Sequence, residues 1–353
     1  MSIAISCPVN NTGYGLASIN ILKSLYEKEQ DIIYFPIGNP SINSEQDQKM
    51  LVQMYNRRLK FDVNSPYLKI WHQFDLLEHI GRGQYYAFPF FELDTFNHQE
   101  QMSLSVPDVI FATSQWAKNI IQDNVSTLTE IVPLGVDCTI FDYQKIQRTR
   151  TDHKYVFLNI GKWEIRKGHD FIYKVFKDAF PTEEDVELWV LASEQTNNYS
   201  NANELKTWKD IYSTDPRIKL FNGVDNQYQI AQLIANSDCG LYPSRAEGWN
   251  LELLETMAMN KPAIATDYSA HTEFCNKDNC MLVDIDSTEK AFDNKAFNGQ
   301  GNWAKIGPKQ IDQIIYHMRY AYTNRVTTNP NGIITANKYT WSNTTDCILR
   351  CIF

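Results

Sequence analysis

The 353-residue chain lacks the cysteine patterns that hold metal ions or disulfide frameworks. Its seven cysteines are an odd number, and none of them forms a CxxC pair. Cys275 and Cys280 lie near each other, but no second pair with histidine accompanies them, so we expect no zinc site. Unpaired thiols are typical of a reducing compartment, so we expect a cytoplasmic protein.

Long hydrophobic runs are also missing. No apolar stretch approaches the roughly 20 residues that cross a bilayer, so we expect no integral membrane segment. The first residues, MSIAISCPVN, lack the basic region and apolar stretch of a signal peptide.

Positive charge is scarce overall. The chain has 33 basic and 42 acidic residues, so its net charge is −9. Such an excess of negative charge disfavours binding to polyanions. One local exception is the segment MYNRRLKF, which carries Arg57, Arg58 and Lys60. A run of this kind is more often a solvated helix face than a binding patch.

Short apolar runs alternate with amphipathic stretches along the whole chain, which indicates repeated strand–helix units. In the first half we predict strands over 2–7, 67–71, 85–91, 109–112 and 130–132, and helices over 16–26 and 115–122. In the second half we predict strands over 155–159, 187–191, 218–221, 239–242 and 263–265, and helices over 168–178, 227–236 and 251–259. The fold class is therefore α/β with parallel sheets, whose ligands bind at the carboxyl ends of the strands.

Two stretches fall outside this pattern. The polar residues 141–154 separate a strand-like run from a fresh strand, and a chain of this length suits two domains, so we place the domain boundary there. Residues 284–308 are rich in Asn, Asp and Gly and are predicted to form a long loop.

The segment PSRAEGWNLELLETMAMNKP (243–262) has two glutamates eight positions apart. Glu247 lies in the loop after a predicted strand, and Glu255 lies in the following helix. The free N–H groups of Gly248, Trp249 and Asn250 open that helix and form a natural anion site. Such a helix could hold a phosphate at its N-terminus and a ribose at Glu255. On spacing alone, a capped surface helix with two solvated glutamates is the favoured interpretation.

The segment GKWEIRKG (161–168) directly follows a strand and precedes a helix. Lys162, Arg166 and Lys167 place three cations around a turn bounded by glycines. This arrangement suits a diphosphate, bound through charge-assisted hydrogen bonds. It is not a Walker P-loop, which needs GxxxxGK[ST]. A charged turn without a ligand is the alternative interpretation.

Together, GKWEIRKG and EGWNLELLE resemble the retaining glycosyltransferases of family four. The resemblance extends through RIKLFNGVDNQYQIAQLIANSDCGLYPS and KPAIATDYSAHTEF, and in the first half through VIFATSQWAKNIIQDN and IVPLGVD. It is densest over residues 155–280. It implies the GT-B fold, in which two Rossmann-like domains face a central cleft. An acceptor-side domain would comprise 1–148 and a nucleotide-sugar-binding domain 149–339, with a terminal helix, 340–353, packing back onto the first.

The resemblance also implies roles for individual residues. Glu247 would grip the sugar, Lys167 would neutralise the donor diphosphate, and His72, at the end of the strand in KIWHQF, would face the transferred sugar; these are the implied catalytic residues. Within the donor site, Glu255 would bind the ribose, and the glycines near the N-terminus would let their loop approach the substrates closely. The implied donor-binding residues are Gly13, Gly15, Lys162, Gly223, Gly248, Trp249, Asn250 and Glu255.

Several positions depart from the family pattern. Lys162 replaces the usual arginine and so offers a point charge instead of a planar fork. Asn250 replaces a glycine, and Ser269 with Ala270 replaces a Gly-Gly pair. These departures leave the donor base and the donor sugar open.

The resemblance implies that a sugar moves from a UDP- or GDP-linked donor to an acceptor hydroxyl with retention of anomeric configuration. No metal and no other cofactor is implied, because lysines and the helix N-terminus replace the metal. The expected acceptor is a glycan or another small hydroxyl compound. One alternative is a phage-type DNA glycosyltransferase acting on hydroxymethylated bases, with phosphate contacts from Arg57, Arg58 and Lys60. A non-catalytic sugar-nucleotide-binding protein of the same fold is the other.

Overall fold

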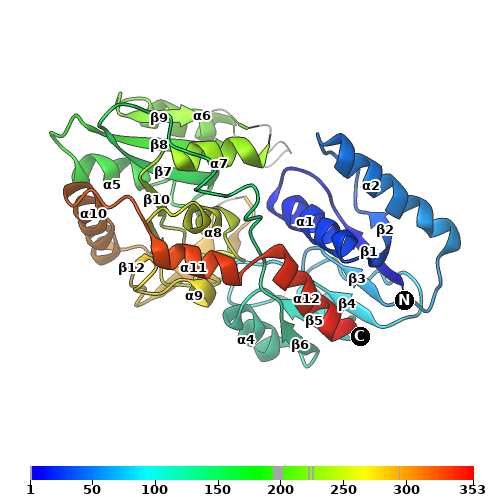
Figure 1. Cartoon of the computed structure of the whole chain (residues 1–353). Helices are drawn as coiled ribbons and strands as arrows, with labels where there is room; N and C mark the ends of the chain where they lie inside the picture. The colour runs from blue at the N-terminus through cyan, green and yellow to red at the C-terminus, as the bar shows by residue number, and fades with distance from the viewer. Residues whose placement is uncertain (1, 194–201, 222, 225, 294) are drawn as a thin grey trace. The chain divides into compact units, whose positions relative to one another are not determined.

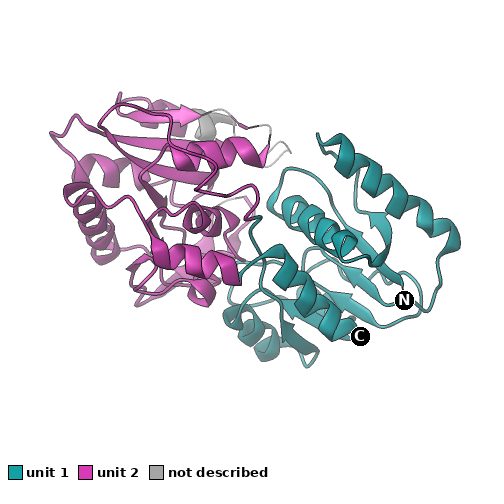
Figure 2. Cartoon of the chain, in the orientation of Figure 1, with its two compact units in different colours: residues 1–137, 339–353 teal, residues 138–338 magenta. Residues whose placement is uncertain are grey.

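A computed structural model describes every residue except 1, 194–201, 222, 225 and 294. The chain divides into two compact units, drawn in teal and magenta in Figure 2. Unit 1 comprises residues 1–137 and 339–353, and unit 2 comprises residues 138–338. The boundary that we predicted, between 148 and 149, lies within a segment that clusters with unit 2.

Unit 1 is built on a parallel sheet with the strand order β2-β1-β3-β4-β5-β6 (Figure 1). Its strands are β1 (Ser2–Cys7), β2 (Asp31–Pro36), β3 (Tyr67–Lys69), β4 (Tyr85–Ala87), β5 (Val109–Ala112) and β6 (Leu128–Ile131). Its helices are α1 (Gly13–Glu27), α2 (Glu45–Asn56), the 3-10 helix η1 (Arg57–Lys60), α3 (His98–Leu104), α4 (Gln115–Asn124) and α12 (Trp341–Ile352). The chain leaves β1 on one side and β3 on the other, so the loops after these two strands meet at a topological switch point.

Helices of unit 1 begin where a polar side chain caps them. Ser114 follows β5, and its hydroxyl accepts a hydrogen bond from the Ala117 N–H, which starts α4. Thr340 caps α12 in the same way, through the Asn343 N–H. The terminal helix packs on α1, where the hydroxyls of Ser24 and Thr345 lie 2.8 Å apart.

Unit 2 contains a second parallel sheet, with the order β12-β11-β10-β7-β8-β9. Its strands are β7 (Tyr155–Lys162), β8 (Val186–Ser193), β9 (Ile218–Phe221), β10 (Cys239–Tyr242), β11 (Ala263–Thr266) and β12 (Met281–Val283). Its helices are α5 (Ile172–Ala179), α6 (Ala202–Tyr212), α7 (Gln227–Ala235), α8 (Leu251–Ala258), α9 (His271–Phe274), α10 (Pro308–Thr323) and α11 (Pro330–Lys338). The chain leaves β7 toward β8 and reaches β10 on the opposite side, so the switch point lies between β7 and β10.

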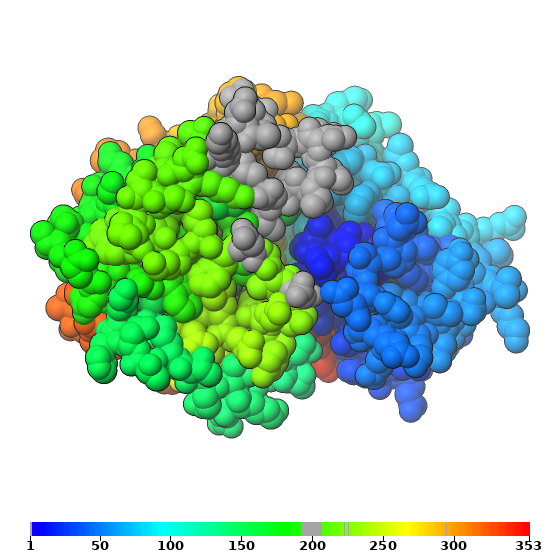
Figure 3. Space-filling view, turned by 90° about the horizontal axis from the view of Figure 1, so that it is seen from above, coloured from blue at the N-terminus to red at the C-terminus, as the bar shows by residue number. Residues whose placement is uncertain are grey.

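The strands of unit 2 are near-continuous apolar runs because they lie in a core between layers of helices. β7 is buried along almost its whole length and pairs with β8 from Tyr155–Val186 to Lys162–Ser193. Buried residues of α5 and α10, such as Phe176 and Met318, belong to the same core cluster as Phe157. A parallel sheet covered by helices buries both faces of its strands. Among the helices, α7 lies at the surface of unit 2 (yellow-green in Figure 3).

The predicted α/β architecture with parallel sheets is confirmed, but the prediction that residues 284–308 form a long loop is wrong. This segment contains an antiparallel hairpin of β13 (Thr288–Phe292) and β14 (Asn298–Ala304). Gly299 and Gly301 adopt positive φ within β14, and the register shifts between Lys290 and Phe292. Its buried residues, such as Ala291 and Trp303, stand among glycine, asparagine and charged residues, so the sequence shows no strand-like alternation.

No helix in the described part of the chain is both long and apolar enough to span a membrane.

Candidate functional site

Two loops meet at the switch point of unit 2 and are joined by hydrogen bonds. One loop, 163–168, follows β7, and the other, 243–250, follows β10. The Arg245 N–H donates to the carbonyl of Arg166 at 2.7 Å. The Arg166 guanidinium in turn donates to the carbonyl of Ala246 at 2.8 Å. The two segments singled out by sequence are therefore brought together into one preformed site.

Glu247 lies at the centre of this site and is only 4% exposed. Its Oε2 accepts a hydrogen bond from Arg166 Nη1 at 2.7 Å, and its Oε1 lies 2.8 Å from Lys167 Nζ. Burial alone would raise the pKa of this carboxyl, but Lys167 and Arg166 outweigh it and hold the pKa far below its ordinary value. Glu247 is therefore a carboxylate at neutral pH.

Lys167 reaches Glu247 because Gly161 leaves room for it. A Cβ on Gly161 would lie 3.3 Å from Cδ of Lys167, so the lysine stem runs against the glycine backbone. Burial would lower the pKa of the ammonium, but Glu247 and Glu252 raise it overall. The site thus contains an ammonium that is charged at neutral pH and buried except for 7% of its surface.

Arg166 has a different position from the one that sequence reasoning suggested. We grouped it with the cations around a diphosphate, but its guanidinium is bound to Glu247 and Glu164. It is 5% exposed. Its role in this structure is to hold Glu247 in place, which the residue pattern alone could not distinguish from ligand binding.

The helix α8 begins at Asn250, which adopts a left-handed conformation with φ +82°. Its side-chain oxygen accepts from the Leu253 N–H, and its Nδ2 lies 2.9 Å from His271 Nε2. His271 Nδ1 lies 2.9 Å from the carbonyl of Thr266, which can only accept, so Nδ1 carries the proton and Nε2 accepts from Asn250. Burial lowers the pKa of His271, so it stays neutral.

These contacts explain how a residue other than glycine opens α8. The left-handed conformation costs little for glycine and more for other residues, although Asn tolerates it best. Two side-chain hydrogen bonds fix Asn250 there. His271 was missed as a supporting residue, and its place in the segment KPAIATDYSAHTEF was the available signal.

Glu255 lies on α8 and is 4% exposed. Its side chain has no hydrogen-bond or ion-pair partner among the described residues. Burial, and to a lesser extent the neighbouring Glu252, raises its pKa well above the ordinary value. A buried carboxyl without a partner is unfavourable, which makes it a candidate for contact with a ligand.

The remaining predicted residues of unit 2 differ in their surroundings. Lys162, the last residue of β7, is half-buried, and its ammonium makes neither a hydrogen bond nor an ion pair within the described part of the chain, although it helps to lower the pKa of Glu164. Trp249 is buried and packs on Phe274 with ring centroids 4.9 Å apart, and Gly248 beside it is buried as well. Gly223 follows β9, two strands from β7, and a Cβ there would meet nothing within 4 Å, so sterics do not explain this glycine.

Gly13, Gly15 and His72 lie at the switch point of unit 1, after β1 and β3. Both glycines lie in the first turn of α1 and not in the loop where we placed them; a Cβ on Gly15 would come within 2.3 Å of Asn10, so packing of the helix against that loop requires this glycine, whereas a Cβ on Gly13 would meet open space. The His72 ring lies 4.5 Å from Tyr14, a neighbour of both glycines that sequence reasoning did not single out. The structure thus brings these three predicted residues together within unit 1.

Part of unit 2 is similar to a family of known proteins. Residues 154–296 match the family described as Glycosyl transferases group 1. The chain is 24% identical over 176 residues to an uncharacterized glycosyltransferase of Methanocaldococcus jannaschii, covering 45% of this chain and 40% of that protein. It is also 24% identical over 182 residues to a GDP-mannose-dependent α-(1-6)-phosphatidylinositol dimannoside mannosyltransferase of Mycobacterium tuberculosis, covering 50% of this chain and 45% of that protein. The chain therefore spans less than half the length of these two relatives.

Among solved structures, the chain resembles Anabaena HepE in complex with UDP and glucose. The TM-score is 0.69 at 14% identity, and the match covers 100% of this chain and 99% of that one. Together with the two parallel six-stranded sheets, this likeness confirms the predicted GT-B fold, with its two Rossmann-like units.

Proposed function

We propose that the chain is a glycosyltransferase that moves a sugar from a nucleotide-diphosphate donor to an acceptor hydroxyl, with retention of anomeric configuration. The observation that carries the proposal is the unpartnered carboxyl of Glu255, buried on the helix whose first turn meets the Lys167–Glu247 pair. Ribose hydroxyls would supply the missing hydrogen bonds of Glu255. The match of residues 154–296 to group 1 glycosyl transferases supports the same assignment.

The donor diphosphate would bind between the two joined loops. Lys162 has no ion-pair partner in the described part of the chain, and Lys167 is charged, so both could form charge-assisted hydrogen bonds with phosphate oxygens. The backbone N–H groups at the start of α8 would add the partial positive charge of a helix N-terminus. Neither a metal nor another cofactor is needed for this charge balance.

Glu247 would face the transferred sugar. Because Arg166 and Lys167 keep it ionised, its negative charge can stabilise the positive charge that develops on the sugar ring as the bond to the diphosphate breaks. In a front-face reaction, the leaving phosphate oxygen takes the proton of the attacking acceptor hydroxyl. The acceptor then enters on the face that the diphosphate leaves, so no protein nucleophile is required and the configuration is retained.

Both UDP- and GDP-linked sugars are candidate donors. The mycobacterial relative is named as GDP-mannose-dependent, and the Anabaena structure contains UDP with glucose. The departures at Lys162 and Asn250 lie where the phosphates and the sugar would bind, so they do not choose between the bases. A panel of both donor types is therefore the first experiment.

The test combines calorimetric titration with turnover. UDP-glucose, UDP-N-acetylglucosamine and GDP-mannose are titrated into the protein, and products with simple glycoside acceptors are followed by mass spectrometry and by NMR of the new anomeric proton. We expect binding of at least one donor, weakened in Glu255→Gln and unchanged in Glu184→Gln, an exposed glutamate of the same unit. Donor binding without transfer to any acceptor would indicate a non-catalytic sugar-nucleotide-binding protein. Absence of donor binding would refute the proposal.

A further inference from the structure

We propose that the acceptor is a saccharide without phosphate groups, held in unit 1 against the exposed ring of Phe74, and that it is not a nucleic acid. This inference rests on the proposed transfer reaction and adds the chemical class of its acceptor. It comes from the distribution of charged and aromatic residues around the sheet of unit 1.

In unit 1, the loops at the carboxyl ends of the strands are acidic, and a basic cluster lies at the opposite end of the sheet. The segments that follow the carboxyl ends of the strands are 8–12, 37–44, 70–78, 88–97, 113–114 and 132–137, and the rest of the β3–β4 connection, 79–84, leads to the amino end of β4 and contains Arg82. The segments at the carboxyl ends contain no lysine or arginine, and their charged residues are Asp75, Glu78, Glu92, Asp94 and Asp137. Lys69, at the end of β3, is 2% exposed and lies 3.7 Å from both Asp75 and Glu78, beneath this acidic edge.

The basic cluster Arg57, Arg58 and Lys60 lies at the other end. Arg57 donates to the carbonyl of Ile32 and pairs with Asp31, which are the first residues of β2. Arg58 is stacked over the ring of Tyr55, 3.2 Å from its centroid. Ligands of parallel α/β sheets bind at the carboxyl ends of the strands, so this cluster is on the wrong end to contact an acceptor there.

The carboxyl ends of β1 and β3 instead present aromatic rings. Phe74 is 47% exposed, and one face of its ring is stacked on His72 at 5.0 Å with an interplanar angle of 9°. His72 is backed by Tyr14, whose hydroxyl donates to the carbonyl of Phe90 at 2.9 Å. Trp71 contacts the same histidine and donates its N–H to Asp75. One face of the Phe74 ring is therefore packed on His72, and part of the remaining ring surface is open to solvent.

A pyranose matches this surface. One face of the sugar ring consists of C–H groups that pack on an aromatic ring, and its rim carries hydroxyls. Asp75 and Glu78 lie within four residues of Phe74, are exposed over 56% and 72% of their side chains, and are acceptors for sugar hydroxyls. A phosphate group at this edge would meet like charge from the same carboxylates and no exposed cation in the segments that form it.

The test uses the full-length protein and a donor that it binds. Acceptors are compared as matched pairs, the methyl glycosides of glucose, mannose and galactose against their 6-phosphates, together with a duplex that contains 5-hydroxymethylcytosine. We expect transfer to a methyl glycoside, at least tenfold less to its 6-phosphate and none to the duplex. In saturation-transfer NMR, the ring protons of the C–H face should receive the strongest signal.

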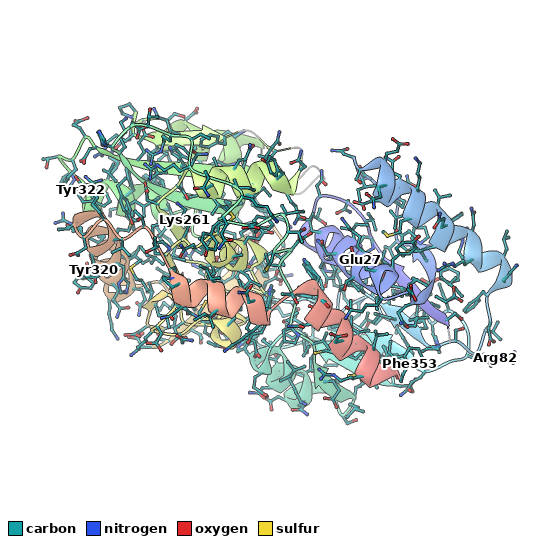
Figure 4. The ribbon with its side chains drawn as sticks, in the orientation of Figure 1. Glu27, Arg82, Lys261, Tyr320, Tyr322 and Phe353 are labelled. Atoms are coloured by element: carbon teal, nitrogen blue, oxygen red, sulfur yellow. The ribbon has the colours of Figure 1, made fainter. Side chains whose placement is uncertain are left out.

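Variants locate the site. Phe74→Ala should raise the acceptor KM about tenfold with donor binding and melting temperature unchanged, and Phe74→Tyr should restore it. The matched control is Phe353→Ala, a 60%-exposed phenylalanine of the same unit, which Figure 4 labels at the end of the terminal helix. Preferred transfer to a 6-phosphate or to the duplex would overturn the inference, as would an acceptor KM that Phe74→Ala leaves unchanged. Failure of the proposed function is a separate result, because the wild-type protein would then bind none of the donors.

Discussion

The Lys167 ammonium lies 2.8 Å from the Glu247 carboxylate, and both side chains are more than nine-tenths buried. Removing two charges from water is unfavourable, and such a pair persists only when further contacts satisfy it. Arg166 supplies those contacts by binding the second carboxylate oxygen and the carbonyl of Ala246. The charges that would meet a donor are therefore in place before any ligand binds, and a phosphate would share Lys167 with Glu247.

Lys167→Ala should weaken donor binding and stability together. A charge-assisted hydrogen bond contributes about 1.5–3 kcal/mol, which corresponds to roughly ten- to a hundredfold in donor affinity. Calorimetric titration and urea unfolding measure the two effects. The matched control is Lys154→Ala, which breaks the partly exposed pair with Glu187 in the same unit and should cost only about 0–1 kcal/mol of stability. If Lys167→Ala binds the donor as tightly as wild type does, residues 161–168 are not part of the donor site.

Asn250 should tolerate glycine better than alanine. Glycine keeps the left-handed backbone but loses the cap to Leu253 and the bond to His271, whereas alanine loses both and adds backbone strain. Loss of an N-cap to alanine costs about 0.5–2 kcal/mol, and to glycine only a few tenths. Urea midpoints of the two variants check this order. Equal stability of the alanine and glycine variants would show that the φ of +82° is not required.

Much of the fold was predictable, because its central strands are mostly apolar and many of its helices begin at polar caps. The runs at β1, β7 and β10 show this directly. The hairpin β13–β14 was not predictable, since glycine and asparagine in β14 carry no strand signal.

For the site, the motif residues Lys167 and Glu247 were identified from sequence, but their direct pairing was not. Arg166 shows the reason. A cation in a turn gives the same sequence pattern whether it binds a phosphate or a carboxylate 81 positions away. His271 and Tyr14 were missed for a related reason, since supporting contacts depend on the folded chain.

Transfer activity should survive EDTA. In the proposed complex the diphosphate charge is met by Lys162, Lys167 and the N–H groups that open α8, so no divalent cation has to bridge the phosphates. Turnover measured after dialysis against EDTA, with and without added Mg²⁺ or Mn²⁺, should differ by less than about twofold. Complete loss of activity that either metal restores would contradict this charge balance.

Glu247 and Glu255 should affect stability in opposite directions. Lys167 and Arg166 hold the folded pKa of Glu247 below its ordinary 4.5, so its stabilising contribution is present above pH 4.5 and is lost as the pH falls below that value. Burial raises the folded pKa of Glu255 above 4.5, so the folded state keeps a proton that the unfolded state releases, and stability falls as the pH rises from 4.5.

At pH 7.5, Glu247→Gln should therefore lower the urea midpoint, and Glu255→Gln should raise it. The Glu255 difference should shrink toward pH 4.5, whereas the Glu247 difference should shrink only below pH 4.5, where the unfolded carboxyl takes up a proton that the folded one does not. The same sign for both variants at pH 7.5 would contradict the opposite environments of the two carboxyls.

Kinetics should separate the two glutamates as well. Glu255 would bind the ribose, which changes little during the reaction, so Glu255→Gln should weaken the ground state and the transition state similarly. Its main effect should be a donor KM raised about tenfold with kcat nearly unchanged. Glu247 would face the sugar, whose charge develops only in the transition state, so Glu247→Gln should lower kcat by about a hundredfold or more with a smaller change in KM. Gln keeps the shape in both cases, removes the charge of Glu247 and replaces one carboxyl oxygen of Glu255 with an N–H donor, and Glu184→Gln is the control. Small and equal effects would make the pair a structural feature, and the reversed pattern would mean that the donor lies the other way round between the two loops.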